Sequence, residues 1–504
     1  MGEHCESCVY VPPGLVDDIS KQGVLRWEDP RGEHTVRLTY PILAPATVRA
    51  IQNRLRSARE EYLVPMTTQR IAGDCARAAR LWCDPAFELR RKAEALLPVI
   101  TGFSSEMVTR TLDSMMLGLT EESLMGMVCG ELGCAEALDR FIYREGTAYR
   151  SMAMGPGLVT EVFSGNVPGL PVLSIICGLL TKSAVFGKCA TGEPLFPALF
   201  ARTLREIGSP LAHALAILYW EGGNEEIERA AFSGADAIIA YGGPEAIAGI
   251  RRGIPAETRF VPYGHKISFG VVSAARLTSA TLSTLAKAAA RDTAVFDQQG
   301  CLSPHAVFVQ NGAEVPPKAF AEALGVELES LAHELPRGTL SQHEAIEMQN
   351  TRARALFSAI KGDSVTLFAS EGNLQWTVIH DESGVFTPSC LNRVVRVVPF
   401  NTFEDLLTLV APLRGFLQTV GCAVSRAESL ELGLALGAMG ATRFVPLGTM
   451  TDVTTDWHHD GRYNILDLVY WVDIVEECGA DVSRGGENGD ALSRVSANEG
   501  RCTR

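Results

Sequence analysis

Apolar residues recur three and four positions apart through the first part of the chain, as is typical of amphipathic helices. The repeat is clear in residues 47–63 and 85–100, and it continues through 104–117 and 121–132. The pattern predicts a mainly helical N-terminal segment, residues 1–150, packed against the domain that follows.

From residue 158 the rhythm changes to short apolar runs of strand length that alternate with helical stretches. In the first set the runs are 159–163, 183–188, 214–219, 237–241 and 259–261; in the second they are 306–309, 365–368, 376–379, 394–400 and 420–424. Such alternation is typical of parallel sheets. We therefore predict an α/β fold with two Rossmann-like domains, residues 151–290 and 291–445.

The end of the chain divides into two further parts. Residues 446–476 still contain apolar positions and are expected to return to the core or to an oligomer sheet. Residues 477–504 are rich in Gly, Ser, Asn and charged residues and have little to bury. This composition predicts a disordered tail.

Composition narrows the classes of partner. The net charge of −14 argues against a broad basic surface for nucleic acid. The most apolar stretch, 167–180, is interrupted by Pro and Gly and is shorter than the roughly 20 residues that a membrane span needs. The 13 cysteines are scattered, and no signal peptide pattern opens the chain, which favours the cytoplasm.

Cys301 follows a glycine at the start of the second α/β set, directly before an apolar run. A lone cysteine in a protein of this kind is more often a small core residue than a nucleophile. Three turns at predicted strand ends change the balance: they contain Asn166, Lys188 and the pair Gly242–Gly243. Ligands bind beyond the carboxyl ends of strands in open parallel sheets, although each residue alone could be a loop cap, a surface lysine or a simple turn.

Taken in order, these segments resemble the aldehyde dehydrogenase superfamily. More narrowly, the chain resembles the acyl-CoA reductase family that includes the fatty acyl reductases of bacterial luminescence. Five segments between about Thr101 and Asp473 carry the closer resemblance: GNVPG at 165–169, YWEGG at 219–223, YGHKIS at 263–268, DQQGC at 297–301 and WHHDG at 457–461. The resemblance implies an aldehyde dehydrogenase-like fold in which residues 151–290 bind a nicotinamide cofactor and 291–445 carry the nucleophile.

The resemblance also implies roles for single residues. Cys301 would be the nucleophile, because a thiolate exchanges readily with a thioester, and Asn166 would stabilise the tetrahedral oxyanion with its amide N–H. Lys188 would bind the cofactor ribose, and Gly242 and Gly243 would face the pyrophosphate.

Thr191 stands three residues after Lys188, where superfamily members that prefer NAD often carry a glutamate. A carboxylate there would repel a 2′-phosphate, whereas threonine would not. We therefore expect NADPH as the reductant, with NADH as the alternative.

Two departures from the superfamily pattern bear on the reaction. Pro262 aligns with the glutamate that acts as general base in hydrolytic aldehyde dehydrogenases, and proline cannot activate water. Ser389 aligns roughly with the glutamate that holds the nicotinamide ribose. The first departure favours a reductase, whose acyl-enzyme must survive until hydride arrives.

Three histidines, His305, His265 and His458, are candidates for lining the site, although a structural role is the preferred interpretation for the first two. Adjacent residues on an extended segment point apart, so we predict no metal site at His458, His459 and Asp460.

The sequence thus predicts reduction of an acyl thioester to an aldehyde through an acyl-cysteine. The substrate would be an acyl-CoA or acyl-carrier thioester, and the resemblance also implies an acyl-transferring partner protein and a homo-oligomer. Two alternatives stay open: a hydrolytic aldehyde dehydrogenase, and a catalytically idle scaffold subunit of an acyl-processing complex.

Overall fold

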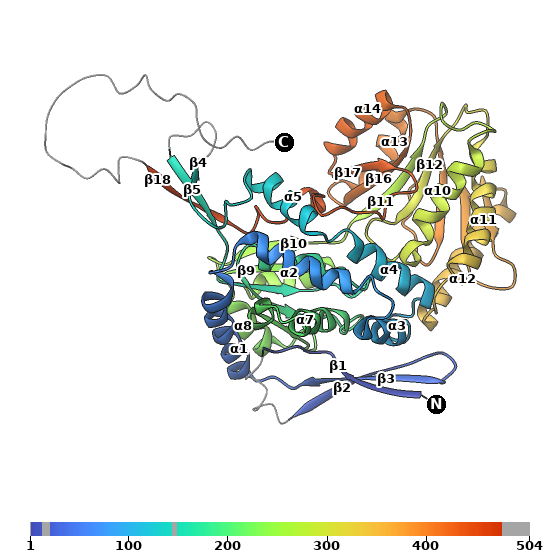
Figure 1. Cartoon of the computed structure of the whole chain (residues 1–504). Coiled ribbons are helices and arrows are strands. Elements are labelled where there is room, and N and C mark those ends of the chain that lie inside the picture. Colours follow the sequence, from blue (N-terminus) through green and yellow to red (C-terminus); the bar gives the residue numbers. More distant parts are fainter. Residues whose placement is uncertain (1, 13–20, 144–148, 476–504) are drawn as a thin grey trace, which may run out of the picture.

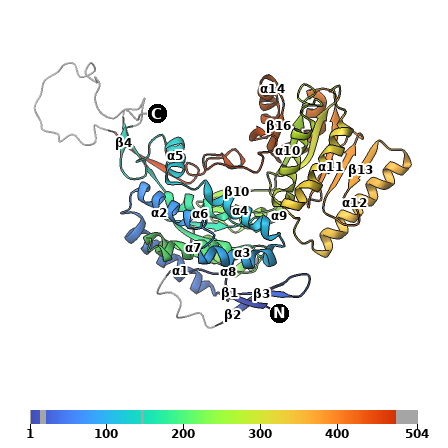
Figure 2. The same cartoon turned by 45° about the vertical axis from the view of Figure 1, so that its right-hand side comes forward.

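The computed structural model describes residues 2–12, 21–143 and 149–475. Two units built on parallel sheets lie next to each other, and a small N-terminal sheet lies under the first of them (Figures 1 and 2). The predicted tail at 477–504 lies outside the described residues.

The N-terminal segment begins with a three-stranded sheet that the apolar repeat did not predict. It consists of β1 (Gly2–Ser7), β3 (His34–Pro41) and β2 (Gln22–Glu28), in that spatial order. Strand β2 alternates between exposed and half-buried positions, so it lacks the fully buried face that marks a strand in sequence. Tyr10, just after β1, forms an antiparallel bridge with Ile217 and joins this sheet to the first large sheet.

The predicted helices of this segment are confirmed. They are α1 (Pro45–Ala58), the π-helical η2 (Arg59–Leu63), α2 (Thr68–Leu81), α3 (Glu88–Thr101), α4 (Ser105–Leu117) and α5 (Glu121–Leu132). Side-chain caps from Thr67, Ser104 and Thr120 begin the second, fourth and fifth of the α-helices. Their apolar faces pack into the same core as the first large sheet.

The first large sheet is fully parallel and has the strand order β10-β9-β6-β7-β8. Its strands are β6 (Leu158–Val162), β7 (Ala184–Lys188), β8 (Leu215–Leu218), β9 (Ala237–Tyr241) and β10 (Arg259–Tyr263); its helices are α6 (Pro171–Leu180), α7 (Phe196–Glu206), η3 (Pro210–Ala214), α8 (Glu225–Ser233) and α9 (Pro244–Arg252). The predicted strands are confirmed. From β6 the chain adds β7 and β8 on one side and then returns to add β9 and β10 on the other, so the strand order switches between β6 and β9. Open α/β sheets bind ligands at such a switch point.

The second large sheet has the order β13-β14-β15-β12-β11-β16-β17 and is parallel except for the β13–β14 pair. The strands are β11 (Ile267–Val272), β12 (Pro304–Gln310), β13 (Val365–Ala369), β14 (Thr377–Asp381), β15 (Val394–Phe400), β16 (Leu417–Ala423) and β17 (Arg443–Pro446). Helices α10 (Leu282–Ala294), η4 (Val295–Gln298), α11 (Pro317–Glu334), α12 (Gln342–Lys361), α13 (Phe403–Val410), η5 (Ala411–Leu413) and α14 (Arg426–Gly437) connect them. One boundary needs a correction: β11 pairs with β12 and β16, so the chain enters this sheet at Ile267, before the predicted division at 290/291.

The C-terminal segment crosses back from the second unit to the first, as the orange-red trace in Figure 2 shows. It contains the short helix η6 (His459–Gly461) and ends in β18 (Tyr470–Val475). Strand β18 pairs with β5 (Tyr149–Met154), which in turn pairs with β4 (Ile142–Tyr143), and all three are antiparallel. The crossing places residues 457–460 between the two units.

Candidate active site

A pocket of about 540 Å³ lies between the two units and gathers residues from distant parts of the sequence. The loop after β6, the loop after β9 and the loop after β10 meet the segment before β12 and the C-terminal crossing. Six of the predicted site residues line it: Asn166, Gly242, Gly243, His265, Cys301 and His305.

Strand β11, which the sequence did not predict, holds Cys301 at the pocket. Ser268 on β11 donates its hydroxyl to the carbonyl oxygen of Cys301 at 2.7 Å. The cysteine is partly exposed, and the protein atoms packed around its thiol raise the pKa of Cys301 to about 12, with a further contribution from the charge of Asp460. The Gln418 side chain and nearby backbone N–H groups oppose that increase.

The loop before Cys301 has an unusual backbone. Phe296, Asp297 and Gln298 all have positive φ angles, and so do residues 391–393 of the loop that faces them. Gln298 is fully buried and ties the two loops together, because its amide group donates to the carbonyl of Val394 and accepts from its N–H. A strained backbone of this kind persists only where the surroundings hold it in place.

A buried ion pair completes this support. The guanidinium group of Arg393 contacts the carboxylate of Asp297 at 2.8 Å, and the two side chains are only 1% and 5% exposed. Asp297 also accepts the backbone N–H of Gly338 at 2.9 Å. The pair therefore fixes the position of the loop that presents Cys301.

Asn166 reaches the same place from the other unit. Its Nδ2 donates to the carbonyl oxygen of Gln299 at 2.9 Å, so one of its two amide N–H groups stays available to a ligand. Gly165 makes this approach feasible, since a Cβ there would lie 2.9 Å from both the Cβ of Ala190 and the backbone nitrogen of Glu193.

The predicted cofactor residues fall into two groups. Gly242 and Gly243 line the pocket, and Gly243 caps α9 without any side-chain cap, so backbone N–H groups at this helix end are available to an anion. Lys188 ends β7, and burial lowers its pKa. The Thr191 hydroxyl bonds the Tyr219 hydroxyl at 3.0 Å. Neither Lys188 nor Thr191 is among the residues that line the Cys301 pocket.

The three predicted histidines lie in different surroundings. His305 is 6% exposed, burial lowers its pKa to about 4, and its Nδ1 accepts the backbone N–H of Ser389, so the ring is neutral at physiological pH. His265 lines the pocket and is exposed. His458 instead packs edge-on against Tyr463, and its neighbour His459 enters the pocket and stacks on Tyr263.

Three site residues were not predicted from the sequence: His459, Asp460 and Gln418. Gln418 on β16 donates its Nε2 to Oδ1 of Asp460, and both line the pocket with Cys301. Asp460 has a φ of 52°, a conformation that aspartate tolerates better than most residues. The WHHDG segment was the only signal, and it did not indicate which of its polar side chains faces the site.

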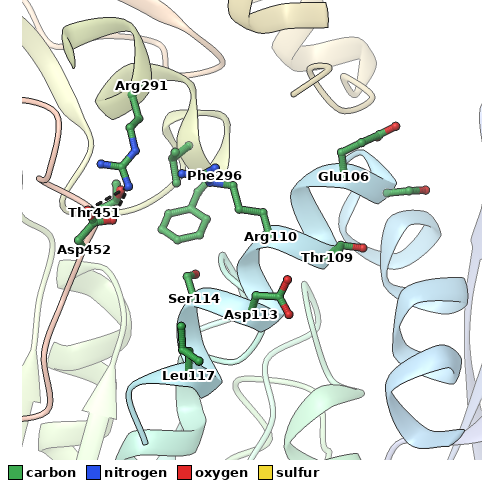
Figure 3. A pocket seen from close by; sticks show the side chains of 12 residues that line it. Glu106, Thr109, Arg110, Asp113, Ser114, Leu117, Arg291, Phe296, Thr451 and Asp452 are labelled. Atoms are coloured by element: carbon green, nitrogen blue, oxygen red, sulfur yellow. Dashed lines mark hydrogen bonds and ion pairs between the residues drawn. The ribbon is translucent and has the colours of Figure 1, made fainter. Parts of the chain in front are cut away.

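A second, largely apolar cavity adjoins this pocket. Leu170, Tyr241, Tyr263 and His459 line both, and the second cavity continues along α4 and α6 past Met115, Leu119 and Leu173. At Ser114 it meets an outer cavity of about 720 Å³ between α4 and the ends of α10 and the C-terminal crossing. Figure 3 shows this outer cavity, with Arg110 and Asp113 on α4 opposite the Arg291–Asp452 ion pair.

A family model described as acyl-CoA reductase (LuxC) matches residues 63–471. The chain belongs to the acyl-CoA reductase (LuxC) family. It is therefore an oxidoreductase that reduces acyl groups to aldehydes, as the sequence predicted.

Relatives agree with this acyl-CoA reductase assignment, and solved structures show the fold. The long-chain acyl-protein thioester reductase of Photorhabdus luminescens is 25% identical over 396 residues, 78% of each chain. That of Aliivibrio fischeri is 25% identical over 398 residues, covering 78% of this chain and 79% of its own. Among solved structures, a 3,6-anhydro-L-galactose dehydrogenase has a TM-score of 0.69 at 14% identity, covering 94% of this chain and 99% of its own. The aldehyde dehydrogenase-like fold is confirmed.

Pro262 leaves β10 without a carboxylate at the aligned position, but the site as a whole has one, because Asp460 enters it from the C-terminal crossing. Sequence alignment with the superfamily base could not show this, since Asp460 lies on a different element. No helix among the described residues is long and apolar enough to cross a membrane.

The buried ion pair of this acyl-CoA reductase allows a stability prediction. We expect Arg393→Met to lower the free energy of unfolding by about 3–5 kcal/mol, because it leaves the Asp297 carboxylate buried without its cation. Urea unfolding followed by intrinsic fluorescence measures the change. The control is Arg462→Met, which breaks the more exposed pair with Asp467 and should cost less than about 1 kcal/mol. Equal losses in the two variants would contradict the role given to Arg393.

Proposed function

We propose that this enzyme reduces an acyl thioester to an aldehyde with NADPH through a covalent acyl group on Cys301. The observation that carries the proposal is the position of Cys301, which lies beside Asn166 and the glycine turn of α9 at the inner end of an apolar cavity. The nucleophile, an oxyanion donor, an anion-binding helix end and space for an acyl chain thus meet at one place.

The first half of the reaction moves the acyl group. The sulfur of Cys301 attacks the thioester carbonyl carbon, Asn166 donates an N–H to the developing oxyanion, and the carrier leaves as a free thiol. Asp460 accepts the proton of the Cys301 thiol and returns it to the departing sulfur. At a pKa of about 12 only about one thiol in 10⁵ is ionised at pH 7, so attack needs such a base.

The second half reduces the acyl group. NADPH, when bound, would supply hydride to the carbonyl carbon. Asn166 stabilises the resulting oxyanion in the same way, and its collapse breaks the carbon–sulfur bond, which releases the aldehyde and returns Cys301 to the thiol after it takes up one proton. The bare N–H groups of α9 and the neutral Gly242–Gly243 turn fit the cofactor pyrophosphate.

Asp460 also gives the hydrolytic alternative a specific basis, because a carboxylate in the pocket could activate water. Its hydrogen bond from Gln418 and the effect of its charge on the Cys301 thiol favour the thiol as its proton donor. The two functions differ in product. With acyl-CoA and NADPH, the proposed enzyme forms one aldehyde for each NADPH consumed, whereas a hydrolase forms acid without consuming NADPH and an idle scaffold forms neither.

Cofactor preference rests on Thr191. We expect Thr191→Glu to raise the KM for NADPH about 30-fold, because a carboxylate near the 2′-phosphate adds roughly 2 kcal/mol of repulsion. Thr191→Gln, of similar size but uncharged, is the control and should change it only a few-fold. Steady-state kinetics with NADPH and NADH measure both. An unchanged KM for NADPH in Thr191→Glu would place the 2′-phosphate elsewhere.

The substrate class follows from the relatives and the cavity. The named relatives are long-chain acyl-protein thioester reductases. The apolar second cavity, of about 90 Å³, meets the outer cavity of about 720 Å³ at Ser114, and together they offer a path for a long hydrocarbon chain. We therefore propose a long-chain acyl group delivered by a partner protein, with acyl-CoA as a substitute carrier.

The β18–β5–β4 sheet offers a surface for assembly. The outer sheet strand β18 exposes Tyr470, Val472 and Ile474, which are 53%, 37% and 41% accessible. An exposed strand with apolar side chains is a typical surface for pairing with another copy. We propose a homo-oligomer formed through the β18–β5–β4 sheet.

A further inference from the structure

Glu161 lies at the centre of the first large sheet and has no place in the reaction described above. It is on β6, fully buried, and among the described residues neither carboxyl oxygen has a well-formed hydrogen bond. Burial raises the pKa of Glu161 to about 8, so the group is mostly a neutral acid at pH 7. An unsatisfied carboxyl group in a core is costly and therefore needs a reason.

Ser174 and Tyr241 stand between Glu161 and the apolar cavity. The Ser174 side chain faces both the Glu161 carboxyl group and the Tyr241 hydroxyl group. Ser174 is 7% exposed, and its Oγ also lacks a well-formed hydrogen bond within the described chain. Gly178, one turn along α6, leaves room for this arrangement, because a Cβ there would lie 3.1 Å from Oε1 of Glu161.

Two of these three residues line the cavity that adjoins the Cys301 pocket. Ser174 and Tyr241 line the apolar cavity, and Tyr241 lines the Cys301 pocket too. The polar trio Glu161–Ser174–Tyr241 therefore lies at the wall of the cavity near its catalytic end. The other side chains along α4 and α6 at this cavity are mainly apolar, including Met115, Leu119 and Leu173.

We propose that the polar trio binds a hydroxyl group on the acyl chain, in the half of the chain nearer the thioester, so that the preferred substrate is a hydroxyacyl thioester. The inference rests on the proposed function and adds the chemistry of the chain. Ser174 and Tyr241 touch the substrate hydroxyl, and Glu161 is a positioning residue that orients Ser174 from behind.

A hydroxyl group suits the trio better than other substituents. Serine, tyrosine and a neutral carboxyl group can each donate and accept one hydrogen bond, which matches a group that does both. A plain methylene would offer no hydrogen bond to Ser174 and Tyr241, and buried polar groups built for hydrogen bonding reject analogues that lack the partner. A charged substituent would have to be desolvated opposite neutral groups.

The test compares myristoyl-CoA with its β-, δ- and ω-hydroxy derivatives in NADPH-linked assays of the full-length enzyme. We expect kcat/KM for the β- or δ-hydroxy substrate to exceed that for myristoyl-CoA about ten-fold. Ser174→Ala and Tyr241→Phe should each bring the ratio close to one, and Glu161→Gln, which can still donate and accept, should keep most of it. Thr454→Val, which removes a hydroxyl that the C-terminal crossing contributes to the same cavity, is the matched control and should leave the ratio unchanged.

The outcomes separate this inference from the proposed function. Equal turnover of all four substrates, a preference for the ω-hydroxy substrate alone, or a preference that survives Ser174→Ala and Tyr241→Phe would overturn it while leaving the reductase intact. If no acyl-CoA is reduced by the wild-type enzyme, the proposed function itself fails. Because each ratio is taken within one variant, partial loss of folded protein does not affect it, and thermal melting confirms that each variant is folded.

Discussion

Replacing Cys301 with alanine should lower aldehyde formation by roughly 10⁴-fold or more and abolish the acyl adduct on the protein. The expected size follows from the behaviour of covalent nucleophiles, whose removal leaves only binding and oxyanion stabilisation. NADPH binding should change little, since the side chain is lost from the catalytic loop and not from the turn at Gly242 and Gly243. NADPH oxidation with myristoyl-CoA, together with NADPH fluorescence titration, measures the two effects.

Cys422 provides the matched control for this prediction. It lies on β16 in the same sheet, and burial raises its pKa to about 12, as for Cys301. It is not among the residues that line the pocket. Cys422→Ala should therefore keep nearly full activity. Comparable losses in the two variants would indicate that cysteine replacement harms the sheet and that Cys301 has no special role.

Replacing Asp460 with asparagine should slow acylation of Cys301 by about 10²- to 10⁴-fold, which is the usual contribution of a general base. The direction of the change in acylation rate distinguishes a general base from a mere neighbouring charge. Besides burial, the negative charge of Asp460 raises the pKa of the Cys301 thiol, so its removal lowers that pKa and makes the thiolate easier to form. If Asp460 were only a neighbouring charge, Asp460→Asn would speed acylation at neutral pH.

Rapid-quench acylation and the pH dependence of iodoacetamide labelling measure these two quantities separately. We expect the pH at which labelling rises to move downward in Asp460→Asn while acylation by thioester slows. Asp467→Asn is the control, because Asp467 pairs with the surface residue Arg462 and lies outside the Cys301 pocket. Faster acylation in Asp460→Asn would remove Asp460 from the mechanism, and a longer-lived acyl-enzyme with unchanged acylation would assign it to water instead.

Apolar periodicity and the family motifs predicted most of the fold. The strands that the sequence did not predict were missed for physical reasons. The strands of the first large sheet are almost fully buried, so they read as continuous apolar runs, as β6 and β7 show. Strands β1 and β2 have half-exposed faces and many charged residues, so their signal was weak. Strand β11 is fully buried, but it lies close after β10 without an intervening helix, and this short connection hid the change of sheet.

Site residues on a short loop beside a strand were predicted from the sequence. Site residues on the long C-terminal crossing were missed. Cys301 and Asn166 follow strands or precede them directly, so their place at the sheet edge follows from the strand pattern. His459 and Asp460 reach the site through a segment with little regular structure, and the positive φ of Asp460 departs from the geometry of an extended strand. Alternation along an extended strand therefore could not tell His458 from His459.

The measurement that tests the central claim most directly is the intact mass of the enzyme after mixing with myristoyl-CoA, without and then with NADPH. The account predicts one added myristoyl group, located on Cys301 by peptide mapping, that disappears on addition of NADPH as an equal amount of aldehyde is formed. An adduct on another residue, or loss of the Cys301 adduct as free acid at the same rate with and without NADPH, would contradict it.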